Sequence, residues 1–241
     1  MKILQLNAWG GKLGSQIIAL LQREQADVVC FQEALRFPGG RSFLFDDIDS
    51  IAKKTGYEHI NFSPHVGYPL MKRTAQMGLV ILSRHQFTGA VITPLRLTYN
   101  SDFDLIASDY NIQSLQHVSI KHGMISLHVL NYHGYHIHEH KNGSPETLRQ
   151  CKLIKDYIST LSGPVVLCGD FNLAPQSASI ALIEEKMVNL VTESHTISTR
   201  TELTAKQEVC DYIFTSSDLS VKHFVVLDDV VSDHRALVLE I

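Results

Sequence analysis

Short runs of apolar residues recur along this chain, and several of them stop at a polar residue that can take part in chemistry. Residues 165–168 read Val-Val-Leu-Cys after a proline, which predicts a buried strand that ends at Gly169. Asp170 and Asn172 follow two positions apart, so in extended backbone their side chains point to the same side. A carboxylate and an amide held side by side suit metal-assisted phosphate chemistry. Taken alone, however, the stretch is better explained as an Asx turn.

The same pattern occurs at most of the other predicted strands, which argues against a set of unrelated turns. An acid directly after an apolar strand, such as Glu33, is costly to bury unpaired and requires a cation or strong donors. A histidine beside a carboxylate, such as His234 after Asp233, is the expected setting of an oriented imidazole. The polar residues at strand ends are Asn7, Glu33, His133, Asp170, Asn172, Asp211, Asp233 and His234. Because strand ends in a layered α/β protein line up along one edge, we expect these side chains to share one crevice.

Helical patterns alternate with the predicted strands. We predict helices from Ser15 as N-cap through Leu21, from about Asp46 to Gly56, from Ser144 and Pro145 towards Gly163, and around residues 179–187. Residues 63–77, which include Lys72 and Arg73, predict a loop near the site, and residues 93–109 predict a polar irregular stretch. The alternation indicates an α/β fold. Because no Pro/Ser-rich linker or charge block interrupts it, we expect a single domain over residues 1–241.

The composition is that of a globular chain with a large core. Of the 241 residues, 44% are hydrophobic and 19% are charged. The formal net charge of −4 argues against broad non-specific binding to nucleic acid, which needs a positive surface. The N-terminus lacks a signal-peptide pattern, no apolar run approaches the length of a membrane span, and the four scattered cysteines are typical of reduced core residues. We therefore expect a cytoplasmic monomer without stable membrane association.

Histidines alternate just beyond the predicted strand that ends near His133. His136, His138 and His140 would allow a zinc site, because imidazole is a common metal ligand. No cysteine or carboxylate spacing nearby completes a zinc motif, which favours a polar loop on the substrate side. We predict that His136 contacts substrate, together with Asn131 at the end of the same predicted strand and Arg84 at the end of another.

Across the chain, the polar strand ends follow a recognisable order. Leu-Asn-x-Trp, Gln-Glu, Asn-x-His, Gly-Asp-Phe-Asn, Asp-Tyr-Ile-Phe and Ser-Asp-His succeed one another between Leu6 and His234. This order resembles the endonuclease/exonuclease/phosphatase superfamily, which includes DNase I-like nucleases, abasic-site endonucleases, sphingomyelinases and inositol polyphosphate phosphatases. The resemblance implies a four-layer α/β/β/α sandwich with two packed mixed β-sheets. It also implies a Mg²⁺ or Mn²⁺ cofactor.

The resemblance assigns metal-binding roles to three residues. It implies that Glu33 is the principal metal ligand, with Asn7 and Asp233 beside the ion. These residue types agree with the chemistry, because Mg²⁺ prefers oxygen ligands and takes only one or two carboxylates while keeping several waters.

The resemblance also implies catalytic roles for five residues. Asp170 would align or deprotonate the attacking water, with Asn172 holding it and the phosphate. His234 would contact the scissile phosphate, oriented by Asp211, and His133 occupies the position of a second histidine found in nucleases and sphingomyelinases. From its own sequence context alone, Asp211 is equally compatible with an edge-strand carboxylate that points to solvent.

Three functions follow from this pattern. The first is a metal-dependent phosphodiesterase or nuclease that acts on nucleic acid or nucleotide phosphodiesters by in-line attack of an activated water. The second is a phospholipid, inositol-phosphate or other small phosphoester hydrolase on the same site, although the segment 135–141 is His-rich where inositol phosphatases carry basic motifs. The third is a catalytically dead binding module, which the intact set of matched residues disfavours.

Overall fold

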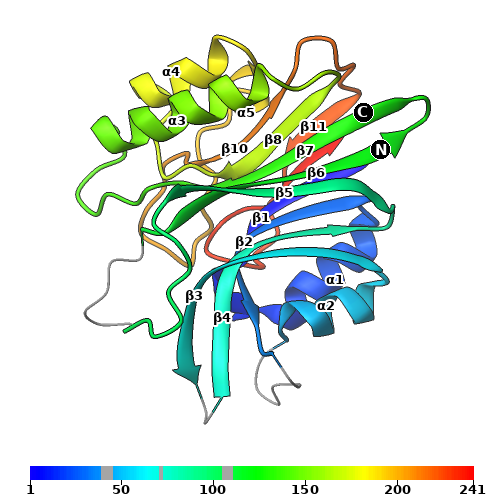
Figure 1. Cartoon of the computed structure of the whole chain (residues 1–241), viewed down its shortest axis with the longest axis vertical. Helices are drawn as coiled ribbons and strands as arrows, with labels where there is room; N and C mark the ends of the chain where they lie inside the picture. The colour runs from blue at the N-terminus through cyan, green and yellow to red at the C-terminus, as the bar shows by residue number, and fades with distance from the viewer. Residues whose placement is uncertain (39–45, 71–72, 105–110) are drawn as a thin grey trace.

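A computed structural model describes residues 1–38, 46–70, 73–104 and 111–241 of the chain. In these residues, two six-stranded β-sheets stack face to face (Figure 1). The first sheet has the order β11-β12-β1-β2-β4-β3, with β1 Lys2–Asn7, β2 Val28–Arg36, β3 His59–Leu70, β4 Arg73–Ser83, β11 His223–Val226 and β12 Leu237–Glu240. The second has the order β5-β6-β7-β8-β10-β9, with β5 Phe87–Arg96, β6 Gln113–His122, β7 Ile125–His133, β8 Val165–Asp170, β9 Val188–Asn189 and β10 Asp211–Thr215.

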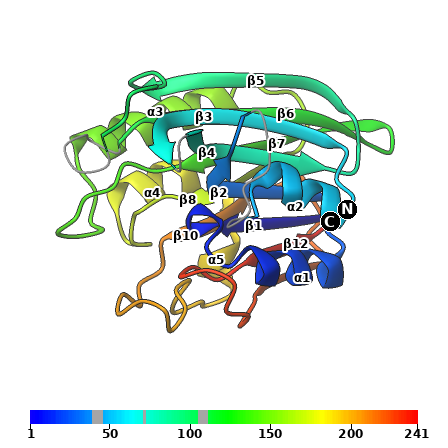
Figure 2. The same ribbon diagram turned by 90° about the horizontal axis from the view of Figure 1, so that it is seen from below.

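Helices cover the outer face of each sheet. The first sheet carries α1 Gly14–Glu24 and α2 Ile48–Thr55, which lie beside β1 and β2 (Figures 1 and 2). The second sheet carries α3 Pro145–Ile158, α4 Ala178–Glu184 and the short α5 Leu190–Glu193 (Figure 1). A single 3-10 turn, η1 Trp9–Gly11, follows β1. This arrangement confirms the predicted α/β/β/α sandwich with two mixed sheets.

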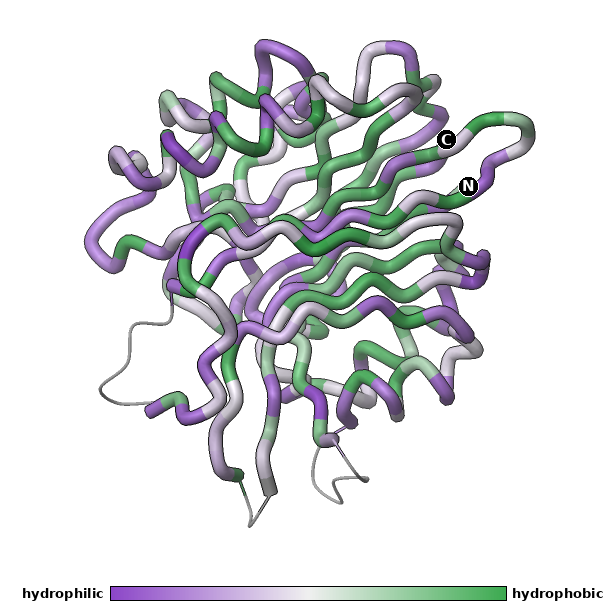
Figure 3. The backbone as a smooth tube through the Cα atoms, viewed as in Figure 1, coloured by the Kyte–Doolittle hydropathy of each residue, from purple (hydrophilic) through white to green (hydrophobic). Residues whose placement is uncertain are grey.

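The two faces of β1 are buried against different layers. Ile3 points between the sheets and packs with Cys30 and residues of the second sheet, whereas Leu4 and Leu6 pack with α1 and α2. Both faces are therefore apolar in the middle of the strand, which is why the sequence shows a continuous apolar run rather than an alternating one. Figure 3 shows the same hydrophobic band along the central strands, with hydrophilic residues concentrated in the helices and connections.

Among the described strands, each sheet contains one parallel pair. β1 pairs in parallel with β2, and β7 pairs in parallel with β8, while the remaining pairings are antiparallel. Helix α1 connects the first parallel pair and α3 the second. The carboxyl ends of β1 and β2 therefore lie at one edge of their sheet, and those of β7 and β8 lie at one edge of theirs.

Helix termini agree with the predicted caps in two cases and differ in one. Ser144 caps α3 through a capping box with Thr147, and Gly56 follows α2 in the left-handed conformation. The Ser15 prediction is wrong, because α1 begins one residue earlier at Gly14 and Ser15 lies inside its first turn. At the start of α2, Asp47 is the N-cap and accepts a hydrogen bond from the Ser50 amide.

The predicted loop over residues 63–77 is wrong. Most of it belongs to β3 and β4, which form a long antiparallel pair. Pro64 and Pro69 suggested a loop, but β3 is an edge strand, where a missing amide donor is tolerated. The same applies to β5, an edge strand that contains Pro94 and extends into the stretch predicted as irregular. The predicted position of Lys72 and the segment 105–110 lie outside the described residues.

Gly169 is required where β8 passes β7 next to the site. A Cβ atom at Gly169 would lie 2.2 Å from the backbone oxygen of Tyr132, whereas a Cβ at Gly89 on β5 would meet nothing closer than 3.7 Å. We expect Gly169→Ala to lower the free energy of unfolding by about 1–3 kcal/mol, because backbone must move to admit the methyl group. Gly89→Ala is the matched strand control and should change it by less than about 0.5 kcal/mol. Urea unfolding of both variants measures the difference, and equal losses would contradict the close approach.

Candidate active site

Polar residues gather where the two sheets place their strand ends at a common edge. Across β7, β8 and β10, the pairing register sets His133, Asp170 and Asp211 side by side. On the facing sheet, Asn7 ends β1 and lies beside Gln32 of β2. The parallel pairs contribute carboxyl ends, whereas the antiparallel β10 contributes its first residue. Sheet topology thus converts positions far apart in the sequence into neighbours.

The inward face of β1 changes from apolar to polar as the strand approaches this edge. Ile3 is in the core, whereas the buried Gln5 donates to Gln32 Oε1 at 2.9 Å and to Asp211 Oδ1 at 3.2 Å. Two positions further, Asn7 donates from Nδ2 to Asp170 Oδ2 at 3.1 Å. One strand therefore connects the core to the site, and its buried amides join the two sheets.

Glu33 enters the site through an irregularity in β2. The pairing of β2 with β4 shifts register between Phe31 and Ala34, and Glu33 has a positive φ of 49°. A bulge of this kind re-aims a side chain at the cost of an unfavourable backbone conformation. The Glu33 carboxylate accepts a hydrogen bond from Asn7 Nδ2 at 3.0 Å, and His133 Nε2 lies 3.9 Å away. Its remaining acceptor capacity faces the pocket.

Asp170 lies at the centre of the hydrogen-bond network. Its side chain is almost fully buried; Oδ1 accepts from the Asn172 backbone amide at 2.9 Å, while Oδ2 is 3.7 Å from the Nε2 atoms of both His133 and His234. Burial alone would favour the neutral acid, but the nearby His234, His133 and Arg200 lower the pKa of Asp170 below its usual value. Asp170 is therefore an ionised carboxylate between two imidazoles.

His234 and Asp211 form a buried pair beside Asp170. His234 Nδ1 lies 2.8 Å from Asp211 Oδ2, and this carboxylate oxygen also accepts from Thr199 Oγ1 at 2.7 Å and from Cys210 Sγ at 3.2 Å. Burial opposes protonation of the imidazole, but Asp211 and Asp170 raise the pKa of His234 above its usual value. Asp211 is fully buried, so the alternative of a solvent-facing edge carboxylate is wrong.

Asn172 is held by a lysine that is itself buried. Lys141 Nζ donates to Asn172 Oδ1 at 2.6 Å, and its residue is only 8% exposed. Burial lowers the pKa of Lys141. Asn172 has a positive φ of 55°, a conformation that asparagine adopts more readily than most residues. The Lys141 contact therefore fixes the amide on the same side as Asp170.

A pocket of about 430 Å³ opens over these groups. Residues from both sheets and from the segments between them line it, among them Trp9, Glu33, His65, His133, His136, Asp170, Asn172, Arg200, Lys206, Asp233 and His234. Burial lowers the pKa of His65 to about 3 and that of His136 to about 4. These two imidazoles are therefore neutral near pH 7, so they serve as hydrogen-bonding walls rather than as cations.

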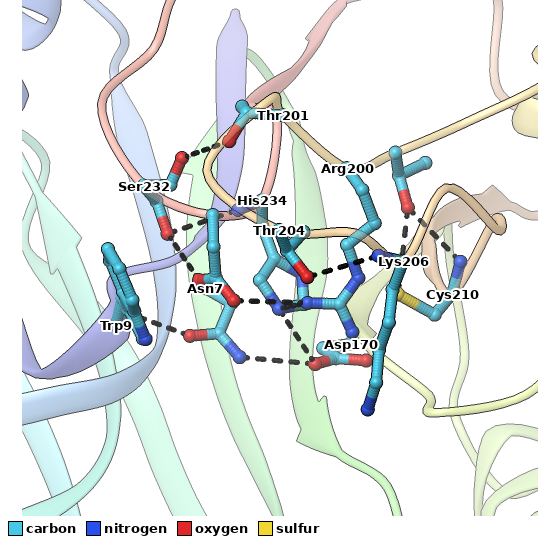
Figure 4. Close-up of polar contacts among 12 residues, drawn as sticks. Asn7, Trp9, Asp170, Arg200, Thr201, Thr204, Lys206, Cys210, Ser232 and His234 are labelled. Carbon is cyan, nitrogen blue, oxygen red and sulfur yellow. Dashed lines mark hydrogen bonds and ion pairs between the residues drawn. The ribbon is translucent and has the colours of Figure 1, made fainter.

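Figure 4 shows that several of these residues converge from different elements. Asn7 and Asp170 point toward each other from the ends of β1 and β8, and His234 and Arg200 approach the same point from two connecting segments (Figure 4). The predicted residues Asn7, Glu33, His133, His136, Asp170, Asn172, Asp211, Asp233 and His234 lie in or directly behind the pocket.

Two predicted substrate-binding residues lie elsewhere. Arg84 follows β4 at the opposite end of the sheet from Glu33, where its guanidinium donates to the backbone oxygens of Ala26 and Thr55. Asn131 is fully buried between the sheets, and its amide donates to the backbone oxygen of Phe31 at 3.0 Å. Arg84 was misplaced because β4 runs antiparallel to β2, so its carboxyl end lies at the edge of the sheet opposite the site. Asn131 was misplaced because alternate side chains of β7 point between the two sheets, and Asn131 is one of them.

The structure does not support the zinc alternative for the alternating histidines. Within the described residues, the only group of three or more candidate ligand atoms lying within 4.8 Å of one another belongs to Asp170, Cys210, Asp211 and His234. Within this group His234 Nδ1 lies 2.8 Å and Cys210 Sγ 3.2 Å from Asp211 Oδ2, and none of the alternating histidines belongs to it. His136 and His138 instead pack ring against ring at 4.5 Å.

Comparison with known proteins agrees with this geometry. The profile of the Endonuclease/Exonuclease/phosphatase family matches residues 4–234. The chain belongs to the endonuclease/exonuclease/phosphatase family. Family membership confirms the resemblance seen in the sequence and identifies the protein as a member of a group of phosphoester hydrolases that generally use divalent metals. A search of curated proteins found no match.

Solved structures share the fold at low sequence identity. An endonuclease/exonuclease/phosphatase from Beutenbergia cavernae is 20% identical with a TM-score of 0.75, covering 99% of this chain and 70% of its own. A mannosyl-6-phosphatase from Bacteroides thetaiotaomicron is 17% identical with a TM-score of 0.71, covering 100% and 98%. The catalytic domain of human Nocturnin is 17% identical with a TM-score of 0.70, covering 99% and 92%.

Two of the predicted metal ligands, Glu33 and Asp233, line the pocket. Glu33 and Asp233 both present carboxylates to the pocket, and Glu33 holds only one hydrogen bond among the described residues. Asn7 lies between two carboxylates, because its Nδ2 donates to Glu33 and Asp170 while its Oδ1 accepts from the Trp9 amide at 3.0 Å; its role beside a metal stays a prediction. In this orientation Asn7 positions the two carboxylates.

Sequence reasoning missed two cations, Lys141 and Arg200. Both lie in polar connecting segments, where a lysine or an arginine is ordinary surface composition. Arg200 joins the site through an isolated antiparallel bridge with His234, a contact between residues far apart in the sequence. No local pattern could have indicated either residue.

Proposed function

We propose that this protein is a divalent-metal-dependent phosphoester hydrolase, and that its substrate is a nucleic acid or nucleotide phosphodiester cleaved by in-line attack of an activated water. The observation that carries the proposal is the ionised Asp170 between two imidazoles at the base of the pocket. Such a carboxylate orients a water and accepts its proton, while the imidazoles lie within reach of a phosphate.

His234 and Asn172 are the groups proposed to contact the phosphate. Asp211 holds His234 by the Nδ1 atom, and its Nε2, which Arg200 Nη1 contacts, lies on the side of the residue that lines the pocket. The ring can therefore stabilise charge on a phosphate oxygen or transfer a proton there. Lys141 positions the side-chain amide of Asn172, and Asp170 accepts a hydrogen bond from the Asn172 backbone amide. These contacts hold Asp170 and Asn172, the two residues proposed to bind the attacking water, in fixed positions relative to each other.

Glu33 and Asp233 are the residues proposed to hold Mg²⁺ or Mn²⁺. Their oxygens match the preference of hard cations, and one or two carboxylates are the usual protein share of a Mg²⁺ site. Such an ion supplies polarisation of a phosphoryl oxygen and stabilisation of the leaving oxygen. Asn7 would keep Glu33 and Asp170 apart at fixed positions, since one amide group donates to both.

The pocket wall favours a nucleotide-sized substrate. Trp9 lines the pocket, and Lys12 Nζ lies 3.7 Å from the centre of its ring. An indole face stacks well on a base, and a cation above it adds charge beside a phosphate backbone. A pocket of about 430 Å³ suits one nucleotide better than a duplex surface.

The same enclosure favours a second candidate, a small phosphoester such as a sugar phosphate. The β3–β4 pair contributes His65 and Met77 to one wall, so a compact substrate would be surrounded. The Bacteroides neighbour named a mannosyl-6-phosphatase shows that the fold occurs in a protein named for such a substrate.

A hydrolysis panel separates these candidates. Purified protein with Mg²⁺ or Mn²⁺ is offered single- and double-stranded DNA, RNA, abasic DNA, dinucleotides, sugar phosphates, phosphoinositides and sphingomyelin, with Asp170→Asn as the blank. Cleavage of nucleic acid or dinucleotides supports the first candidate, and exclusive release of phosphate from sugar phosphates supports the second. Exclusive cleavage of lipid head groups would overturn both.

The same hydrolysis panel, together with a thermal-stability measurement, tests the third function, a catalytically dead binding module. Lack of turnover on every phosphoester, together with no thermal stabilisation by Mg²⁺, would favour it. Within the described residues, no helix combines the length and hydrophobicity needed to cross a bilayer. The monomeric state and the cytoplasmic location stay predictions.

A further inference from the structure

Arg200 is a buried cation at the reacting end of the pocket. Its residue is 6% exposed and lines the pocket together with Asp170 and His234. The backbone around it is fixed, since the Arg200 amide donates to Ser198 Oγ at 3.0 Å and its carbonyl accepts from Arg235 Nε at 3.0 Å. The fold therefore holds the backbone that carries the guanidinium.

The guanidinium has donors that no residue in the described part of the chain uses. Its Nη1 atom contacts His234 Nε2 and lies 3.4 Å from Asp233 Oδ2. Nε is buried and has no hydrogen-bond partner, and Nη2 makes no hydrogen bond with the described residues. A buried N–H without a partner is rare in proteins and calls for an explanation, of which a missing ligand is one.

The free donors of Arg200 suit an anion, even though the carboxylates of Asp170, Asp211 and Asp233 also act on the guanidinium. Arg200 is planar and permanently charged, and its fork matches two oxygens of a phosphate. Asp233 alone does not satisfy it, because a single 3.4 Å contact occupies one nitrogen of three. His234 Nε2 and Asp170 Oδ2, separated by 3.7 Å, mark the place where the proposed reaction occurs.

We propose that Arg200 is a catalytic residue that binds a non-bridging oxygen of the scissile phosphate through its free Nη2–Nε side. This inference rests on the proposed function and adds a residue to it. In the absence of substrate, His234 and Asp233 hold the guanidinium through Nη1. When phosphate enters, Arg200 and His234 bind it from neighbouring positions, and Arg200 stabilises the charge that develops on the oxygens.

Inorganic phosphate tests the inference without any turnover. In the presence of Mg²⁺, the ¹H–¹⁵N signal of Arg200 Nε, assigned by its loss in Arg200→Lys, should shift as phosphate is added to the full-length protein. The Nε signal of Arg23, an exposed arginine on α1 that pairs with Asp229, should stay in place. A stationary Arg200 signal at saturating phosphate would overturn the inference.

Affinity supplies an independent measure. We expect Arg200→Gln to weaken phosphate binding by about tenfold to a hundredfold in calorimetric titration, because a charge-assisted hydrogen bond is lost. Arg200→Lys, which keeps the charge but not the fork, should lie between Arg200→Gln and the wild type. Arg23→Gln is the matched control and should bind like the wild type. Unchanged phosphate affinity in a folded Arg200→Gln would contradict the proposal. If that variant does not fold, the phosphate affinity of Arg200→Lys and the shift of the Arg200 Nε signal in the wild type test the proposal instead.

The outcomes separate the inference from the proposed function. Phosphate binding through Arg200 in a protein that hydrolyses no phosphoester would refute the proposed function and leave the anion site intact. Hydrolysis with normal kcat and KM in Arg200→Gln would refute the inference alone.

Discussion

Replacing Asp170 by asparagine is expected to lower kcat about a hundredfold or more while the protein stays folded. The side chain keeps its shape, and its oxygen can still accept from the Asn172 amide, now 2.9 Å from Oδ1. The negative charge between His133 and His234 is lost, so the attacking water is no longer deprotonated or held in line. Steady-state hydrolysis of the best substrate from the panel, at saturating Mg²⁺, measures the loss.

The matched control for this change is Asp156→Asn. Asp156 is an exposed carboxylate on α3 that pairs with Lys152, so its loss of charge leaves the site untouched. Activity within about twofold of the wild type is expected there, because surface changes of this kind alter energies by less than about 0.5 kcal/mol. Full activity in Asp170→Asn would remove the central residue of the proposed mechanism.

Disrupting the His234–Asp211 pair is expected to have the second largest effect. His234→Ala removes the imidazole, and we expect a hundredfold or greater loss of kcat, in line with about 10²–10⁴-fold for positioned proton-transfer groups. Asp211→Asn leaves the imidazole in place but offers an N–H where Nδ1 or the Thr199 hydroxyl now donates. The ring would lose its orientation, so a comparable loss is expected with the fold retained.

A control variant and a double variant test whether His234 and Asp211 act together. His223→Ala, at an exposed position on β11, is the control for removal of a histidine and should retain activity. Activities of the double variant His234→Ala/Asp211→Asn show whether the pair acts as a unit, because its loss should then match that of His234→Ala alone. Additive losses would mean that Asp211 and His234 contribute to the activity independently.

The polar residues at the ends of apolar runs were predictable for a local reason. A carboxylate such as Glu33 or Asp170 directly after a buried strand is costly to bury unless it binds a cation or hydrogen-bond donors. This unfavourable placement is visible in a single sequence. The layered α/β fold follows from the alternation of buried strands and capped helices, as at Ser144. The part of β3 after Phe62 and the edge strand β5 were missed because their proline and polar content reflects the exposure of edge strands.

The sequence alone determined which residue types face the edge of the sandwich, since apolar periodicity and chain order are local properties. Only the tertiary structure decided which of them meet. Strand direction sent Arg84 to the far end, the inward pleat enclosed Asn131, and a bridge to His234 brought in Arg200. The physical reason is that contacts between distant segments depend on register and direction across two sheets, and no local propensity encodes either.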